Sequence, residues 1–317
     1  MQKSLQKIAN YLVEKPEPPV TIRKVVQIFF TRTSMERALL RTEEDRLNSV
    51  YLPLTDNPKS PHVRRIAFLA EKQKAVEGRA MRTLLQTAAD LNEMKVNKCY
   101  YNEHLCMECP ACVIYGAAST EDGKENNINI KHRIAYSDSV SLLPADQVIE
   151  ELFFNGVDDR QMNCGQSFKN YDVVKPGTVF PSVVTLYSVT EKELVLVLKT
   201  LMGIHKYGAS TRVMGRFINE ITGVAAGLEE FITSPQYTMA LSGMDNPLEN
   251  IRENTRDILL EYKQSQCCTG DYTVILEPNE VESLVEYART VKMDKRFLKS
   301  VYTDAGHYRK VQKSRAK

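Results

Sequence analysis

The chain has 317 residues, of which 43% are hydrophobic and 26% charged, the composition of a soluble globular protein. No stretch approaches the roughly 18 consecutive apolar residues of a membrane span, and the N-terminal segment lacks the apolar core of a signal peptide. Seven cysteines, an odd number with four of them close together, do not form the pattern of a disulfide framework. We therefore expect a cytoplasmic, reducing setting and a metal site.

The formal net charge of +2 is unevenly distributed along the chain. Residues 1–100 contain 18 Lys and Arg against 11 Asp and Glu, a net charge of +7, and the last twelve residues add five basic side chains and no acidic one. Two basic ends around an acidic middle favour an anionic partner on one face and a complementary protein partner on another. Chance asymmetry in a near-neutral protein is the simpler alternative.

Three elements are predicted in the N-terminal third. Residues 1–13 carry apolar side chains at helical spacing, and the prolines that follow end this helix. Residues 21–31 are rich in β-branched and aromatic residues and predict the first strand, and Arg41 comes soon after it. Residues 64–92 predict a long helix with six basic side chains, which is either a nucleic-acid contact or an ordinary solvated face.

A cluster of cysteines follows this helix. Two-residue spacings let thiolates in a tight knuckle face one cation, and four such ligands in a tetrahedral array suit a structural Zn²⁺ ion. The safest ligands are Cys106, Cys109 and Cys112. Cys99 is our first choice for the fourth ligand, with His104 or the distant Cys164 as substitutes. We expect the loss of Cys109 to unfold the zinc-bearing segment and to leave the core folded.

Two other readings of the cysteines stay open. The C-x2-C-x2-C spacing also begins the bacterial ferredoxin pattern, which would make the chain an iron–sulfur redox protein. That pattern needs a cysteine at position 116, where this sequence has Gly116. The third reading is a group of buried free thiols.

No enzymatic motif is present: the chain has no Walker A run, no G-x-S-x-G and no H-E-x-x-H. Asp138 is the candidate acid for a metal-dependent nuclease, the alternative enzymatic function. Such chemistry requires several converging acids, and the sequence places none beside it.

The segment from residue 163 to 216 holds the strongest local signals. Residues 163–190 read as a pair of strands joined at Pro176-Gly177, and Thr190 with Glu193 forms a capping box at the start of an apolar helix over 190–205. The run KYGASTRVMGR at 206–216 follows at once. Its glycines allow a backbone to approach a ligand, and its arginines suit phosphate, although a solvated loop is the simpler reading.

After Gly223 the pattern turns helical. Residues 246–263 and 278–293 are capped and amphipathic, and the basic tail follows them. We therefore predict a helical C-terminal extension over residues 246–317.

Together these features resemble the backbone subunits of type I-D CRISPR surveillance complexes, members of the RAMP superfamily. The resemblance covers about residues 20–225 and rests on four features in order: Arg41-Thr42-Glu43, C-x2-C-P-x-C-x2-Y-G at 106–116, Pro176-Gly177-Thr178, and the run at 206–216. It implies an α+β fold, in which residues 1–317 form one domain with a modified RNA-recognition-motif (RRM-like, ferredoxin-like) core. A zinc-binding insertion at 93–135 and an extended hairpin would be added to that core.

The resemblance also implies a function. Such a subunit is non-catalytic, binds CRISPR guide RNA without reading its sequence, and lines up in copies of itself beside other subunits of an antiviral effector complex. It supports pairing of the guide with target DNA. The RNA-binding positions implied for this chain are Gly208, Thr211, Arg212, Gly215 and Arg216, with Lys206 standing where an arginine is expected and Arg41 matched only by its place after the first strand.

Overall fold

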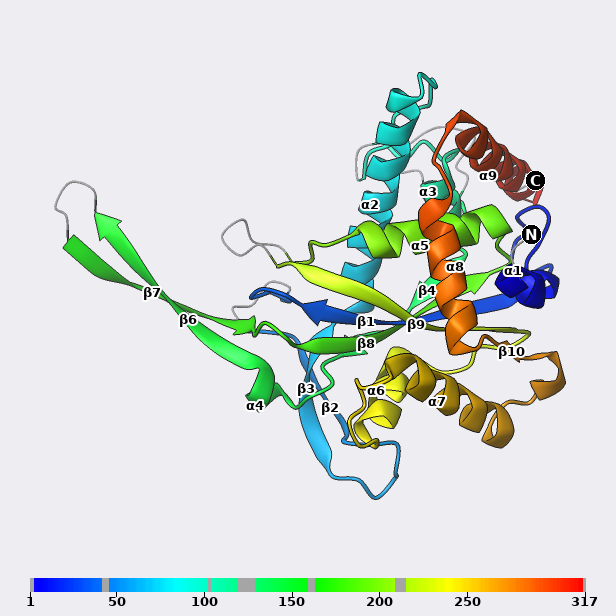
Figure 1. The fold of residues 1–317 in the computed structure, drawn as a ribbon. Coiled ribbons are helices and arrows are strands. Elements are labelled where there is room, and N and C mark those ends of the chain that lie inside the picture. Colours follow the sequence, from blue (N-terminus) through cyan, green and yellow to red (C-terminus); the bar gives the residue numbers. More distant parts are fainter. Residues whose placement is uncertain are drawn as a thin grey trace.

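The computed structural model describes residues 3–41, 46–101, 104–118, 129–158, 163–208 and 215–315 (Figure 1). The fold mixes helices with antiparallel sheets. Its helices are α1 (Lys3–Ile8), α2 (Ala70–Leu91), α3 (Pro110–Tyr115), α4 (Ala145–Val148), α5 (Glu191–Gly203), α6 (Ser234–Ser242), α7 (Ile251–Ser265), α8 (Pro278–Thr290) and α9 (Lys295–Arg315). None of the described helices is long and apolar enough to cross a membrane.

A five-stranded antiparallel sheet forms the centre, in the order β10-β9-β1-β8-β4. Its strands are β1 (Val25–Ser34), β4 (Ile134–Tyr136), β8 (Val179–Tyr187), β9 (Phe217–Gly227) and β10 (Val274–Ile275). The chain visits β1, α2, β4, β8, α5 and β9 in turn, which is a β-α-β-β-α-β sequence. If β1, β4, β8 and β9 are numbered 1 to 4 in this chain order, they lie in the order 4-1-3-2 across the sheet, with β10 at the edge beside β9.

Both faces of this sheet are covered by helices. Successive side chains of β1 point to opposite faces, so their neighbours show what packs on each face. Ile28 and Phe30 are buried in one apolar cluster with residues of α2 and α5. Phe29 is buried on the other side, among residues of α6 and α7. Figure 1 shows α5 and α8 above the sheet and α6 and α7 below it. No face of the sheet is therefore open over its centre.

Two smaller sheets extend from this body. One joins β2 (Ser49–Pro53), β3 (His62–Phe68) and β5 (Ser139–Val140). The other is a hairpin of β6 (Ile149–Asp158) and β7 (Asn163–Val174), which projects well away from the body (Figure 1). A projecting hairpin is one of the features that the family resemblance implies.

The predicted strand at 21–31 and the helices at 190–205, 246–263 and 278–293 are confirmed, with shifts at their ends. The helix expected at 64–92 is wrong over its first residues, because 62–68 form β3 and the helix starts at Ala70. This segment pairs with β2 and β5, and such tertiary pairing overrides a local helical pattern.

Two further expectations about strands are corrected. The strands on either side of Pro176-Gly177 exist, but they do not pair with each other: β7 pairs with β6, while β8 lies in the central sheet between β1 and β4. The chain also does not turn helical at Gly223, because β9 continues to Gly227. A Cβ atom at Gly223 would lie 2.6 Å from Thr255 Cγ2, so this glycine lets α7 pack closely on the strand.

Candidate nucleic-acid interface and metal centre

Helix α5 begins at a capping box that is also part of a buried ion pair. Thr190 Oγ1 accepts from the Glu193 amide at 3.3 Å, and the Thr190 amide donates to Glu193 Oε2 at 3.0 Å, which confirms the predicted cap. The Glu193 carboxylate also accepts from both terminal nitrogens of Arg133. Both charged side chains are almost completely buried, and the Arg133 guanidinium lies 4.5 Å from the Tyr308 ring. This contact ties α5 to α9.

The two described ends of the run at 206–216 lie side by side. The Tyr207 amide donates to the Gly215 carbonyl at 3.0 Å, and Lys206 forms an isolated antiparallel bridge with Arg216. The Lys206 and Arg216 side chains are exposed. The run therefore leaves and re-enters the body at one point between α5 and β9. Thr211 and Arg212 lie outside the described residues.

Gly208 and Gly215 both have positive φ angles, at 97° and 60°. A Cβ atom on Gly208 would lie 2.8 Å from the Leu39 carbonyl oxygen, and one on Gly215 would lie 2.2 Å from that of Tyr207. Neither distance is possible for another residue without moving the backbone. These glycines therefore let segments of this chain pack closely, a reason different from the ligand approach that we inferred from the sequence.

The segment after β1 lies against this loop. The Met35 amide donates to the Arg216 carbonyl at 2.7 Å, and the Leu39 carbonyl lies close to Gly208 as described above. Farther along this segment, half-buried Arg41 has its guanidinium 4.6 Å from the ring of Tyr171, in β7. The structure thus places the segment that leads to Arg41 beside Lys206 and Arg216, although more than 160 residues separate them in the sequence.

Tyr207 anchors the loop to the core. Its hydroxyl donates to Glu77 Oε1 at 2.9 Å, and Arg32 Nη2 donates to the same oxygen at 2.6 Å. The second oxygen of Glu77 accepts from the Tyr136 hydroxyl at 2.6 Å. Burial, together with the Glu77 charge, raises the pKa of Tyr207, so its hydroxyl stays a neutral donor.

Sequence reasoning missed this network. The one signal for it was Arg32, an arginine directly after the predicted strand at 21–31. Both Arg32 and Glu77 are fully buried, and Arg32 also donates to Ser182 Oγ at 2.5 Å.

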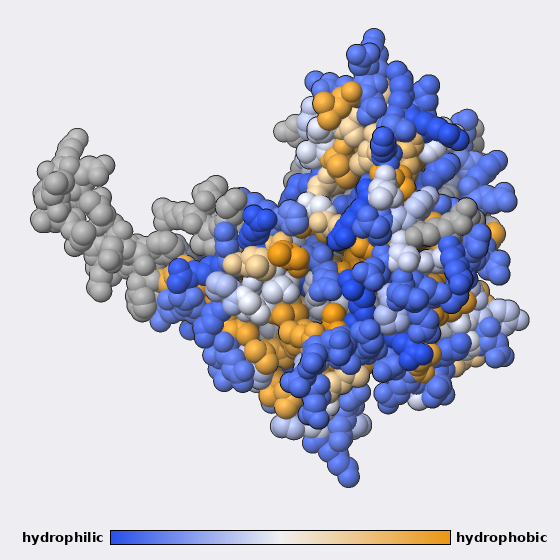
Figure 2. Space-filling model, in the orientation of Figure 1, coloured by the Kyte–Doolittle hydropathy of each residue, from blue (hydrophilic) through white to orange (hydrophobic). Residues whose placement is uncertain are grey.

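A cleft of about 680 Å³ opens near the base of the β6–β7 hairpin. Its lining residues are Arg46, Leu47, Asn48, Ser49, Arg64, Ile66, Glu71, Lys72, Ile149 and Asp172. Three of these are cations and two are anions, and the apolar ones belong to or pack on the cluster that also contains Tyr207. On the face drawn in Figure 2, hydrophilic side chains predominate and apolar ones gather between α4 and α6.

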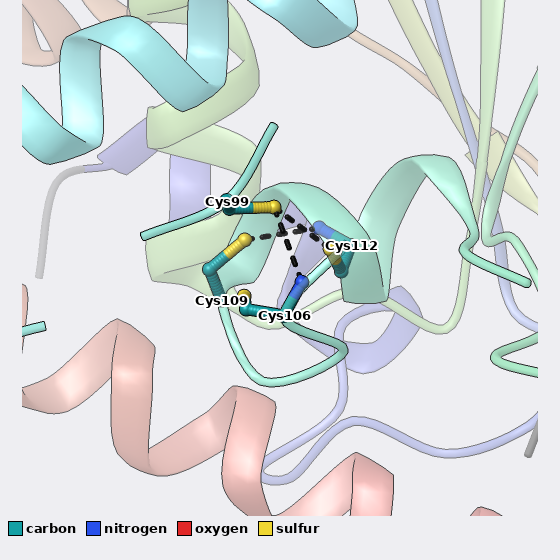
Figure 3. A group of neighbouring side chains, drawn as sticks. All are labelled: Cys99, Cys106, Cys109 and Cys112. Carbon is teal, nitrogen blue, oxygen red and sulfur yellow. Dashed lines mark hydrogen bonds between the residues drawn. The ribbon is translucent and has the colours of Figure 1, made fainter. Parts of the chain in front are cut away.

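The four predicted cysteines converge at the start of α3 (Figure 3). The sulfur atoms of Cys99, Cys106, Cys109 and Cys112 all lie within 4.8 Å of one another. Four thiolates bound to one Zn²⁺ at about 2.3 Å would be spaced by about 3.8 Å, so this group fits a single tetrahedral ion. Hydrogen bonds among the four thiols lower the pKa values of Cys99 and Cys106 and raise those of Cys109 and Cys112, because without an ion the neighbouring thiols act as donors to the first charge.

The local backbone explains this convergence. Cys109 is the N-cap of α3, its sulfur accepts from the Cys112 amide at 3.4 Å, and Pro110 occupies the first turn. Met107, with φ at 58°, makes the sharp turn between Cys106 and Cys109. His104 is exposed and is not a member of the group, and the side chain of Cys164 lies outside the described part of the chain.

The cysteine segment is not separate from the core. Cys99, Cys109 and Cys112 belong to the same buried cluster as Leu194 of α5 and Tyr308 of α9. We expected the loss of Cys109 to unfold the insertion alone; because of this shared packing we now predict that the core is destabilised as well.

Asp138 has a structural role. Its Oδ1 accepts from the Ala70 amide at 2.6 Å, where it satisfies the first turn of α2. Within the described ranges, the cysteine group is the one set of three or more potential metal ligands that lie together.

The chain was compared with families and structures already known. The model of the family described as Csc2 Crispr matches residues 10–301. The crystal structure of Thermofilum pendens Csc2 is 20% identical, with 99% of this chain and 96% of that chain covered and a TM-score of 0.65. No curated protein matches the chain.

Two chains from CRISPR RNA-guided surveillance complexes, one of them in a pre-nicking state, are also similar. They are 11% and 10% identical, with TM-scores of 0.51 and 0.52. In each case 83% of this chain and 99% of the other are covered. At these identities the similarity shows a shared fold.

Proposed function

Because the chain belongs to the Csc2 CRISPR family, we propose that it is a non-catalytic backbone subunit of a type I-D effector complex. In this proposal it binds CRISPR guide RNA without reading the sequence, lines up in copies along the guide, and supports pairing with target DNA. Free cysteines, both buried and exposed, are consistent with a cytoplasmic setting.

We propose that the core is RRM-like. The 4-1-3-2 strand order and the β-α-β-β-α-β sequence support this assignment. RRM domains stack bases on aromatic side chains of the open sheet face. Here α6 and α7 cover one face of the sheet while α2 and α5 cover the other. RNA would therefore bind at the end of the sheet, where loops emerge.

The single observation that carries the proposal is the meeting of two distant segments at that end. The segment leading to Arg41 and the loop of Lys206 and Arg216 are joined by a backbone hydrogen bond. Their basic side chains suit phosphate contacts, which hold a strand in place without selecting a sequence. Target sequence would then be read by base pairing with the guide.

Assembly along the guide requires a further surface that contacts the next copy. A surface that contacts a different surface on the next copy produces an open filament when the rotation does not close. Figure 2 shows an apolar patch between α4 and α6. Leu143, which precedes α4, is 51% accessible. We propose this area as one contact with another subunit of the complex.

We propose zinc as the ion of the four cysteines. Sulfur atoms all within 4.8 Å of one another suit one ion, whereas an iron–sulfur cluster places several irons and sulfides between its ligands. Elemental analysis checks this, with about one zinc per chain expected. A preparation that carries iron instead would contradict it.

The RNA contact is tested by replacing both Arg212 and Arg216 with alanine. We expect weaker binding to single-stranded RNA of any sequence, and a salt dependence reduced by about 1.4 in log–log slope for two lost phosphate contacts. The matched control replaces Arg23 and Arg289, two exposed arginines in surface ion pairs elsewhere. If the affinity of the Arg212/Arg216 variant is unchanged, the loop does not contact the guide.

A further inference from the structure

A second basic and aromatic surface lies where the cysteine segment meets α2. Tyr100 and Tyr101, directly after the buried Cys99, are 46% and 47% exposed. The guanidinium carbons of Arg82 and Arg79 lie 5.0 Å and 5.9 Å from the centre of the Tyr101 ring. One exposed ring therefore has two cations beside it.

Arg82 differs from the other buried arginines of the described chain. Arg32 and Arg133 are each paired with a glutamate, and Arg65 donates to three backbone carbonyls. Arg82 is only 5% exposed, yet its Nε and Nη1 have no hydrogen-bond partner. An almost buried cation without an acceptor is unfavourable. Arg79 is exposed and adds a second positive charge beside Arg82, and no salt bridge to a described carboxylate neutralises either of them.

The backbone that leads into the tyrosines is hydrogen-bonded to neighbouring segments. Cys99 is in the metal group, and its carbonyl accepts from Gln86 Nε2 at 3.1 Å, which ties the segment to α2. The Tyr100 amide donates to the His104 carbonyl at 2.7 Å. Exposed rings on a fixed backbone lose little conformational entropy when a flat ligand stacks on them.

This surface lies close to the loop anchor along the same helix. Arg82 follows Glu77 by five residues, an axial rise of about 7.5 Å. Glu77 holds Tyr207, and so the loop of Lys206 and Arg216. Both surfaces are therefore attached to neighbouring turns of α2.

We propose that Tyr100, Tyr101, Arg79 and Arg82 form a binding site for a single-stranded nucleic acid. A base stacks on an exposed tyrosine ring, and a phosphate supplies an acceptor for Arg82 and a counter-charge for Arg79. The occupant is the guide RNA strand as it continues past the loop, and this identification rests on the proposed function. An acidic peptide could satisfy the arginines, but two exposed rings beside them favour bases.

The test measures binding of labelled single-stranded RNA and DNA of arbitrary sequence. We expect Tyr101→Ala to weaken RNA binding by about tenfold and Tyr101→Phe, which keeps the ring, to leave it unchanged. Arg79→Gln should reduce the log–log salt slope by about 0.7. Melting temperatures show whether each variant is folded, and Arg79 is exposed enough for its replacement to be tolerated.

The outcomes separate this inference from the proposed function. If Arg216→Ala weakens RNA binding and neither Tyr101→Ala nor Arg79→Gln does, this site is wrong while the proposed function stands. If none of the three has an effect, both are wrong. A loss confined to DNA would overturn the guide strand as occupant. Ultraviolet cross-linking to thiouridine-substituted RNA provides a direct readout, and a cross-linked peptide containing Tyr100 and Tyr101 is expected.

Discussion

The Tyr207 hydroxyl and the Arg32 guanidinium both donate to Glu77 Oε1, at 2.9 and 2.6 Å. Tyr207 belongs to the candidate RNA-binding loop, Arg32 to the central strand β1, and Glu77 to α2. A loop that must hold charged side chains against a flexible RNA strand positions them more accurately when the two ends of the loop are fixed by buried groups. This shared carboxylate oxygen connects the loop to the buried core between β1 and α2.

Replacing Tyr207 with phenylalanine removes this anchor and keeps the ring. Glu77 then loses one of its three donors in a buried site, so we expect the free energy of unfolding to fall by about 1–3 kcal/mol. Affinity for single-stranded RNA should fall as well, because the hydrogen bond that fixes Tyr207, and with it the loop, is lost. Tyr272→Phe, at a tyrosine that is 60% exposed, is the control. A stability loss with unchanged RNA affinity would show that the anchor does not serve binding.

The capping box and the buried ion pair at the start of α5 can be separated by mutation. Glu193→Gln keeps an acceptor for the Thr190 amide but leaves Arg133 as an unpaired buried charge, so we expect a loss of about 3–5 kcal/mol. Thr190→Ala removes the side-chain cap, with a loss of about 1 kcal/mol. Urea denaturation measures both. Equal losses would mean that the ion pair contributes no more than the cap.

Removal of the metal should destabilise the whole domain. The cysteines share their buried cluster with α5 and α9, so chelation is expected to lower the melting temperature in one cooperative transition. Cys109→Ser should do the same and abolish metal binding, whereas Cys268→Ser, at an exposed cysteine outside the group, should change neither. A separate early transition that leaves the main one in place would contradict this prediction.

Lys74 provides a test of pH dependence. Burial lowers the pKa of this lysine below its ordinary value of 10.5. The unfolded chain therefore holds the proton more tightly, and the charged form costs stability at every pH below the folded-state pKa. Lys74→Met should raise the melting temperature at neutral pH, and this advantage should shrink as the pH rises toward 10.5. Lys72→Met, at an exposed neighbour, is the control.

Local signals were sufficient for some of these features. The capping box needs only residues 190 and 193, and the turn at Gly177 needs only a residue that tolerates a φ of 82°. The cysteine knuckle depends on two-residue spacings, and the structure brings those sulfur atoms together. Sequence reasoning failed where pairing with distant strands decided the outcome, as in β3, β7 and β9.

The sequence alone therefore determined the elements whose energies depend on near neighbours: the cap at Thr190, the turn before β8 and the metal-binding spacing. Only the tertiary structure decided which distant residues these elements contact, and so which site they support. Glu77 and Tyr207 are 130 residues apart, and no local pattern pairs them. Burial makes the difference, because a carboxylate removed from water must find its donors wherever the fold brings them. The described fold brings no acceptor to Nε and Nη1 of Arg82, and that shortage points to a ligand.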